Sequence, residues 1–274
     1  MLAGLKRSVP YIALKEWTKA LRRRSKLSSY RGTQYRCPIC GVGLKAFKPM
    51  WRSYWIHAQQ YEFVHSPFAM ETFNLGAFSC PACDAFDRER LTALYLDRVL
   101  PSFDRRRRYR LVEFAPATAL RRTVKRYPCI EYRSADLMRN DVDDRFDLTK
   151  CPYADCSVDV FLCSHVLEHI PDDRKAMREL YRILTPDGFG IVLVPLFPAV
   201  DETHEDASIN TVELRAKYFA GGDHVRQYGK RDFLDRLTAA GFRVEQLGID
   251  YFGKVAFRTA GIAENSVLYV VHKQ

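Results

Sequence analysis

The sequence predicts an α/β fold, with a mostly parallel β-sheet, helices on both faces and an antiparallel last strand, preceded by a small cysteine module. From residue 109 onward, short apolar runs alternate with helical stretches, which is typical of parallel sheets. Two CxxC pairs stand ahead of this region. We therefore divide the chain into a basic segment (1–32), a cysteine module with a connecting helix (33–100) and an α/β domain (101–274).

The formal net charge of +10 is concentrated in the first 36 residues, which hold ten basic residues and one acid. The remainder is nearly neutral, with 33 basic and 32 acidic residues. Binding to phosphates normally needs basic side chains at the groove, so nucleic acid is not the expected partner. Leu14, Trp17 and Leu21 lie at helical spacing in the basic segment. We favour a solvated tail there, and an amphipathic helix on an anionic membrane surface is the alternative.

The apolar runs and the cysteines of the sequence indicate in which cell compartment the protein is expected. The sequence has no apolar run of about 18 residues, and its start lacks a long apolar stretch with a small-residue cleavage site. We expect no membrane-spanning helix, no secretory signal and a cytoplasmic location. In a reducing compartment, metal binding explains paired cysteines better than disulfides do.

The two cysteine pairs are matched knuckles, Cys37-Pro-Ile-Cys40 and Cys80-Pro-Ala-Cys83. Each knuckle presents two thiolates from one tight bend, and four sulfurs complete a tetrahedral structural zinc site. The spacer of 39 residues exceeds the ~15–20 usual in zinc ribbons, and four unligated cysteines are the alternative. Because four sulfurs leave no open position, we expect this zinc-ribbon-like module to serve folding.

The elements of the α/β domain follow in order. A helix from Asp87 carries Leu91, Leu94, Tyr95 and Val99 on one face and ends before Pro101. Further helices are expected at 120–126, 174–184 and 231–240, and strands at 109–115, 130–136, 158–164 and 190–195. The last two strands, 242–248 and 266–272, show no clear helix between them, which predicts an antiparallel pair.

The strand ends carry the strongest functional signal. The first strand ends at Glu113, followed by Phe-Ala-Pro-Ala-Thr-Ala, and the second ends at Asp136. A carboxylate at the second position can accept both hydroxyls of a bound ribose. Only ten residues separate Asp136 from Asp147, so any helix between them is short or absent. The segment after residue 157 reads Val-Asp-Val-Phe-Leu-Cys-Ser-His-Val-Leu-Glu-His-Ile.

Over roughly residues 108–274, these motifs resemble the class I methyltransferases, which implies a Rossmann-like fold and S-adenosylmethionine as cofactor. The resemblance places Asp147 and Leu148 near the adenine, and Ser164 and His165 near the sulfonium. Cofactor contacts are expected at Glu113, Ala115, Pro116, Asp136, Asp147, Leu148, Ser164 and His165. The family's first loop is rich in glycine, whereas alanine stands here at 115, 117 and 119, and alanine enters positive φ less readily.

More narrowly, the chain resembles a bacterial methyltransferase group with CPxC knuckles followed by R-x-R, here Arg88 and Arg90, and a DHVR-x-YG segment, here 223–229. The residues before Gly188 also resemble a helix and turn of this family, and we expect a tight turn at Gly188.

The substrate is expected over the carboxyl ends of the strands. A general base is needed only for a weakly nucleophilic acceptor, and His224 and His165 are the catalytic candidates. His224 is preferred because Arg226 and Tyr228 beside it suggest a polar site for an anionic substrate. Arg226, Tyr228 and His204 are the candidate substrate contacts. His169 is expected to be structural.

The expected function is methyl transfer to a small molecule or a glycan or lipid precursor. Two alternatives stay open. The three alanines of the first loop motivate an inactive cofactor-binding scaffold, and the knuckles with the basic tail motivate an RNA-modifying methyltransferase. A dehydrogenase is disfavoured because no G-x-G-x-x-G follows the first strand.

Overall fold

The computed structural model describes residues 27–274 of the chain. The amphipathic helix considered for the basic segment falls on residues outside this described range. Within residues 27–274, no helix combines the length and the apolar character needed to cross a membrane.

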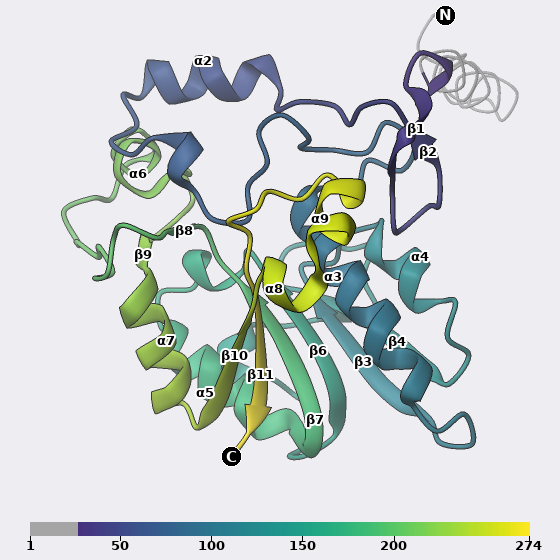
Figure 1. The fold of residues 1–274 in the computed structure, drawn as a ribbon. Coiled ribbons are helices and arrows are strands. Elements are labelled where there is room, and N and C mark those ends of the chain that lie inside the picture. Colours follow the sequence, from purple (N-terminus) through teal and green to yellow (C-terminus); the bar gives the residue numbers. More distant parts are fainter. Residues whose placement is uncertain (1–26) are drawn as a thin grey trace, which may run out of the picture.

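A seven-stranded β-sheet forms the centre of the fold (Figure 1). Five strands run parallel: β3 (Tyr109–Phe114), β4 (Ile130–Asp136), β5 (Asp144–Arg145), β6 (Val158–Ser164) and β7 (Leu184–Leu193). The other two, β10 (Phe242–Leu247) and β11 (Leu268–Lys273), pair antiparallel, and β11 also pairs antiparallel with β7. The order across the sheet is β10-β11-β7-β6-β3-β4-β5. The predicted sheet is confirmed, including the antiparallel C-terminal pair.

Helices cover both faces of the sheet (Figure 1). One face carries α3 (Asp87–Val99), α4 (Leu120–Val124), α8 (Ile249–Phe252) and α9 (Lys254–Ala260), and the other carries α5 (Asp173–Ile183) and α7 (Lys230–Ala239). The ring of Tyr95 in α3 packs on Phe189 of β7, with centroids 5.4 Å apart. On the opposite face, Tyr181 of α5 packs on Phe242 of β10 at 5.3 Å. Two-sided coverage explains why β6 is a nearly continuous buried run.

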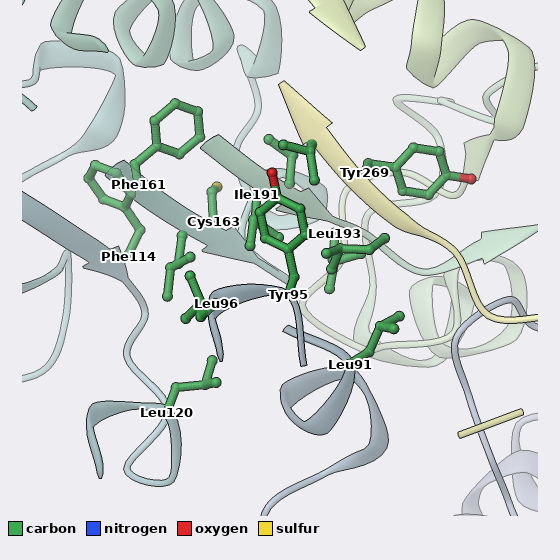
Figure 2. Close-up of a cluster of buried hydrophobic side chains, with 14 of the residues drawn as sticks. Leu91, Tyr95, Leu96, Phe114, Leu120, Phe161, Cys163, Ile191, Leu193 and Tyr269 are labelled. Atoms are coloured by element: carbon green, nitrogen blue, oxygen red, sulfur yellow. The ribbon is translucent and has the colours of Figure 1, made fainter. Parts of the chain in front are cut away.

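The main hydrophobic core joins α3 and α4 to the sheet (Figure 2). Leu91 and Leu96 of α3 and Leu120 of α4 are buried against strand residues such as Phe114 and Ile191. The apolar face predicted from the helical spacing in α3 therefore holds this helix on the sheet, directly beside the end of β3.

The prediction that no helix separates the last two strands is wrong, because α8 and α9 lie between β10 and β11. Both helices are shorter than the windows in which helical periodicity becomes visible. Gly253 and Gly261, with φ of +90° and +64°, end α8 and α9.

The strand predicted at 190–195 begins earlier, at Leu184. Gly188 lies in a bulge of this strand, where the pairing with β6 shifts from Val158–Leu184 to Val160–Phe189. A Cβ at Gly188 would lie 2.5 Å from the carbonyl oxygen of Asp159, so the close approach of the two strands needs glycine. The residues Thr-Pro-Asp-Gly thus form a bulge inside a strand, where a turn before the strand was expected.

The chain before α3 contains the cysteine knuckles, a small hairpin and one helix: β1 (Arg31–Arg36), β2 (Gly43–Leu44) and α2 (Arg52–Gln60). Arg90, which is fully buried, attaches this region to α9. Its guanidinium donates to the carbonyl oxygens of Ala85 at 2.9 Å, Ala260 at 2.7 Å and Gly261 at 3.0 Å. The position of the boundary at residue 100 stays a prediction.

Three further elements lie near α2. The short strands β8 (Leu196–Phe197) and β9 (Tyr228–Gly229) pair with each other, and α6 (Val212–Phe219) lies beside α2 (Figure 1). The Lys217 ammonium of α6 donates to the Glu62 carboxylate just after α2, at 2.9 Å.

Candidate active site

A cavity of about 420 Å³ opens at the carboxyl ends of β3, β4 and β6. Because β4 and β6 flank β3 on opposite sides, this is the point of the sheet where ligands of such folds bind. Of the predicted cofactor residues, the structure brings five together on its wall: Ala115, Asp136, Asp147, Leu148 and His165. A second cavity of about 50 Å³ shares Phe114 and Ala115 and is also lined by Glu113 and Ser164.

The first loop keeps a glycine-like backbone although it contains alanine. Ala115 has φ of +49°, in the left-handed region, which costs an alanine about 1–2 kcal/mol. Its N–H donates to the carbonyl oxygen of Ala135 at 2.9 Å, which ties the loop to the end of β4. Ala119, by contrast, has an ordinary helical φ of −72° at the start of α4. The alanine departure therefore leaves the loop conformation at residue 115 intact.

Glu113, at the end of β3, stabilises this loop through hydrogen bonds. Its carboxylate accepts the N–H of Ala117 at 2.8 Å and the hydroxyl of Tyr132 at 2.6 Å. Burial raises the pKa of Glu113 to about 7. Pro116 lines neither of the two cavities, and its carbonyl oxygen accepts a hydrogen bond from Arg139 at 2.7 Å.

Two carboxylates follow along the cavity: Asp136 at the end of β4, and Asp147 in the loop after β5. One oxygen of Asp136, Oδ1, accepts the N–H groups of Met138 at 2.7 Å and Arg139 at 2.9 Å. No hydrogen bond to its other oxygen, Oδ2, occurs within residues 27–274, so that oxygen is available to a ligand. Asp147 Oδ1 accepts the N–H of Thr149 at 2.8 Å, which fixes the turn that presents Leu148 to the cavity.

The imidazole wall of the cavity consists of His165 and His169, with Asp223 beside His169. His165 has φ of +56°, and its N–H donates to the carbonyl oxygen of Leu193 at 2.8 Å. Burial lowers the pKa of His165 well below its usual value, so the ring is neutral at pH 7. His169 Nδ1 lies 3.4 Å from Asp223 Oδ2. The cavity lining thus combines carboxylates with two imidazoles.

Residues 113–192, from the end of β3 to β7, match the family described as the methyltransferase domain. The matched stretch contains the first loop, both carboxylates and His165. The similarity to a methyltransferase domain therefore covers the part of the chain that forms most of the cavity lining.

A probable S-adenosylmethionine-dependent methyltransferase of Mycolicibacterium smegmatis is 28% identical over 140 residues. The match covers 51% of this chain and 43% of that protein, so the chain spans less than half the length of this relative.

Among solved structures, YcgJ of Bacillus subtilis is 16% identical with a TM-score of 0.41, over 65% of this chain and 97% of that one. The CurJ carbon methyltransferase is 12% identical with a TM-score of 0.44, over 68% of this chain and 57% of that one. The similarity of this chain to methyltransferases rests on the family match and the sheet topology, not on these remote structural likenesses.

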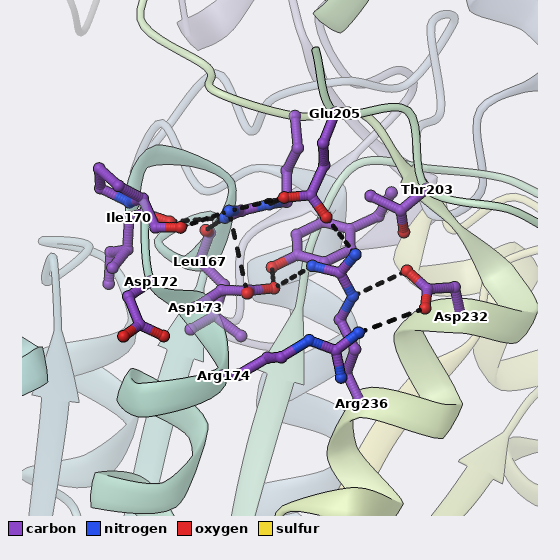
Figure 3. A network of polar contacts seen from close by, with 12 residues as sticks. Leu167, Ile170, Asp172, Asp173, Arg174, Thr203, Glu205, Asp232 and Arg236 are labelled. Atoms are coloured by element: carbon purple, nitrogen blue, oxygen red, sulfur yellow. Dashed lines mark hydrogen bonds and ion pairs between the residues drawn. The ribbon is translucent and has the colours of Figure 1, made fainter. Parts of the chain in front are cut away.

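Arg226 and Tyr228 are buried and do not line the cavity. They belong to a polar network that also contains Leu167, Asp173 and Arg236 (Figure 3). The Arg226 guanidinium donates to three carbonyl oxygens between residues 167 and 171 at 2.5–3.0 Å. The Tyr228 hydroxyl donates to Asp173 at 2.5 Å, and Arg236 donates to the same carboxylate at 2.9 Å. This geometry corrects the expected substrate contacts: both side chains fasten the segment 223–229 to the loop after β6.

The other two histidine candidates are also displaced from the cavity. His204 is exposed, and its ring packs on Phe219 with centroids 5.3 Å apart. His224 lies behind His169, with ring centroids 4.8 Å apart, and burial lowers its pKa to about 4. The cavity geometry favours His165 over His224 as the base for a substrate.

Three neighbours of the cavity were not among the sequence candidates: Glu168, His169 and Asp223. His169 and Asp223 line the cavity, and Glu168 lies just behind it, with its Oε1 3.4 Å from His165 Nδ1. The available signal was the pattern H-x-x-E-H, which puts two imidazoles and a carboxylate within five residues. Its partner segment lies 54 residues further along the chain, and only the fold brings it near.

The four paired cysteines come together ahead of the N-terminus of α3. The Sγ atoms of Cys37 and Cys83 are 3.7 Å apart, and those of Cys40 and Cys80 are 3.8 Å apart. A tetrahedron with Zn–S bonds of about 2.3 Å has sulfur–sulfur edges of about 3.8 Å. The residue after each knuckle, Gly41 or Asp84, has a φ of +71° or +59°, so the two bends are built alike. These sulfurs fit a four-thiolate metal site and are free thiols, not disulfides.

Proposed function

We propose that this protein transfers a methyl group from S-adenosylmethionine to a small molecule or to a glycan or lipid precursor. The observation that carries the proposal is the cavity of about 420 Å³, which joins two strand-end carboxylates to a wall of imidazoles. Its size lies in the ordinary range for small-molecule sites, about 300–1,000 Å³.

The residues present fit the cofactor. Asp136 Oδ2 is open to accept a ribose hydroxyl, and the apolar side chains of Phe146 and Leu148 suit an adenine ring. Ser164 Oγ is buried and has no hydrogen-bond partner within residues 27–274, so a polar ligand group in the adjoining small cavity would satisfy it. When bound, the cofactor supplies an electrophilic methyl group on sulfur.

The protein's part in such a displacement is mainly alignment of the acceptor with the methyl group. His165 is the side chain placed to take a proton from the acceptor, because it lines the cavity and is neutral at pH 7. This arrangement supports an acceptor with an O–H or N–H group. The nearly neutral charge of the chain beyond residue 36 supports a small acceptor over nucleic acid.

We also propose that Cys37, Cys40, Cys80 and Cys83 hold a structural Zn²⁺. The two sulfur–sulfur distances of 3.7 and 3.8 Å support this. Because Arg90 connects this region to α9, loss of the ion would loosen the covering of the methyltransferase domain as well as the knuckles.

The test is methyl transfer from radiolabelled S-adenosylmethionine into three fractions: small metabolites, lipids and glycans, and RNA. We expect label in one of the first two fractions, and a loss of label with His165→Ala that exceeds the loss of cofactor affinity measured on the same variant. Label confined to RNA would replace the proposed acceptor with the RNA alternative. Cofactor binding without label in any fraction would establish the inactive scaffold.

A further inference from the structure

Besides the four cysteines, a second group of side chains that could hold a metal ion lies at the imidazole wall. Single ligand atoms of Glu168, His169 and His224 all lie within 4.8 Å of one another. Two of these residues follow β6 and the third belongs to the segment 223–229. The Val225 N–H donates to the Glu168 carbonyl oxygen at 2.8 Å, and Arg226 fastens the same segment. The cluster is therefore held on a rigid backbone.

The Glu168 carboxylate has no hydrogen-bond partner. It is 1% exposed, and neither Oε1 nor Oε2 has a hydrogen-bond partner within residues 27–274. A buried carboxylate without a hydrogen-bond partner is costly. Buried polar groups in folded proteins are normally satisfied, and a bound ion is one way to satisfy a carboxylate.

The hydrogen bonds around both imidazoles prepare them as ligands. His224 Nδ1 lies 2.6 Å from the carbonyl oxygen of Phe219, which can only accept, so Nδ1 carries the proton and Nε2 carries the lone pair. His169 Nδ1 faces the Asp223 carboxylate at 3.4 Å, while its Nε2 lies 4.0 Å from Glu168 Oε1. Metal-binding histidines are oriented in this way, by a carbonyl or carboxylate on the nitrogen that does not bind the metal.

We propose that Glu168, His169 and His224 bind a divalent transition-metal ion at the imidazole wall of the cavity. Ligand atoms about 2.1 Å from an ion are about 3.4 Å apart in a tetrahedron. The observed separations of up to 4.8 Å require the three side chains to close by about an ångström on binding. His165 Nδ1, 3.4 Å from Glu168 Oε1, is placed to join them as a fourth ligand or to flank the ion.

The donor set indicates the class of ion. Two imidazoles and one carboxylate are the ligands of open catalytic zinc sites and of non-haem iron sites. Mg²⁺ and Ca²⁺ prefer oxygen ligands and are disfavoured. The buried positive charge beside the cluster, Arg226, is paired with Glu205 at 3.1 Å and Asp173 at 3.8 Å, so its repulsion of a cation is reduced.

The consequence for substrate rests on the proposed function. Three protein ligands leave coordination positions for water or substrate, and His165 and His169 connect the cluster to the cavity. An ion there would bind an acceptor oxygen and lower its pKa. The acceptor class that fits is a hydroxyl compound with a second oxygen nearby, which chelates the ion through both atoms.

The test is a Co²⁺ titration of the full-length protein, followed by absorption spectroscopy. Cobalt on the four cysteines gives strong thiolate-to-metal charge-transfer absorption in the near ultraviolet, whereas cobalt on nitrogen and oxygen ligands gives only weak visible bands. We expect two equivalents to bind, one of each type. Glu168→Gln and His169→Ala should raise the Kd of the second type at least about tenfold. The exposed residues Glu131 and His57 supply matched controls, Glu131→Gln and His57→Ala, which should leave it unchanged.

Binding of the thiolate type alone to the wild type would overturn the proposal, and so would a second equivalent that the two cluster variants do not weaken. If those variants do not fold, X-ray absorption at the cobalt edge decides on wild-type protein whose cysteine site is filled with zinc, because cobalt at the second site must show nitrogen and oxygen neighbours near about 2.1 Å and no sulfur near about 2.3 Å. A failed cobalt test with intact cofactor binding would reject the ion site and leave methyl transfer standing.

Discussion

Ala115→Gly and Ala119→Gly are expected to change the stability of the same loop in opposite directions. At residue 115, φ of +49° costs an alanine about 1–2 kcal/mol. Glycine removes that strain and gives back about 0.4–1 kcal/mol through the greater entropy of the unfolded chain. The net expectation is a stabilisation of up to about 1 kcal/mol. At residue 119, φ of −72° suits alanine without strain and the side chain is buried, so glycine should destabilise by about 0.4–1 kcal/mol through the greater entropy of the unfolded chain.

Urea denaturation, followed by circular dichroism, measures both free energies of unfolding on the full chain. Because Ala115 lines the cavity, removal of its Cβ should also leave cofactor affinity unchanged or higher. Equal destabilisation by the two substitutions would refute the left-handed conformation at residue 115. A loss of cofactor binding in Ala115→Gly would refute the placement of this loop against the ligand.

Three other perturbations test the supports of the site. Arg90→Lys should destabilise the protein by about 3 kcal/mol in urea denaturation, because lysine cannot replace the fork that donates to carbonyl oxygens on both sides of α3. The free energy of unfolding of the wild type should fall as the pH rises from about 4.5 to 7, because burial raises the pKa of Glu113 to about 7 and the native state binds the extra proton. Glu113→Gln should reduce the slope of this free energy against pH by about 1.4 kcal/mol per pH unit. An unchanged slope would contradict the burial of Glu113. Removal of Zn²⁺ by a chelator should lower the melting temperature of the wild type but not of a Cys80→Ser variant, and zinc analysis of both proteins checks the premise.

The fold was predictable because its strands are buried on both faces. Runs such as 158–164 are apolar almost throughout, and their alternation with helical stretches allows few topologies. Helices α8 and α9 were not predicted, because short helices show no clear hydrophobic period. The bulge at Gly188 was not predicted, because its sequence is also typical of a turn. Only the closeness of the β6 backbone distinguishes the bulge from a turn.

The site was predictable where local sequence fixes position. Asp136 and Asp147 come at the ends of elements, and parallel strands bring such ends to one edge. Arg226 and Tyr228 were misjudged because polar neighbours of a histidine resemble a binding site, whereas their partners are carbonyl oxygens and a carboxylate from residues 167–173. The pairing of His169 with Asp223 is likewise a tertiary contact across 54 residues, which spacing alone does not reveal.

Calorimetric titration with S-adenosylhomocysteine, on the wild type and on Asp136→Ala, tests the central claim most directly. The account predicts saturable binding to the wild type. It predicts a Kd about 30-fold higher in the variant, since a hydrogen bond to a charged group contributes about 2 kcal/mol. Asp250→Ala, at an exposed position in α8, should bind as the wild type does. No binding to a folded, zinc-loaded wild type, or equal binding to Asp136→Ala, would contradict the assignment of this cavity to the cofactor.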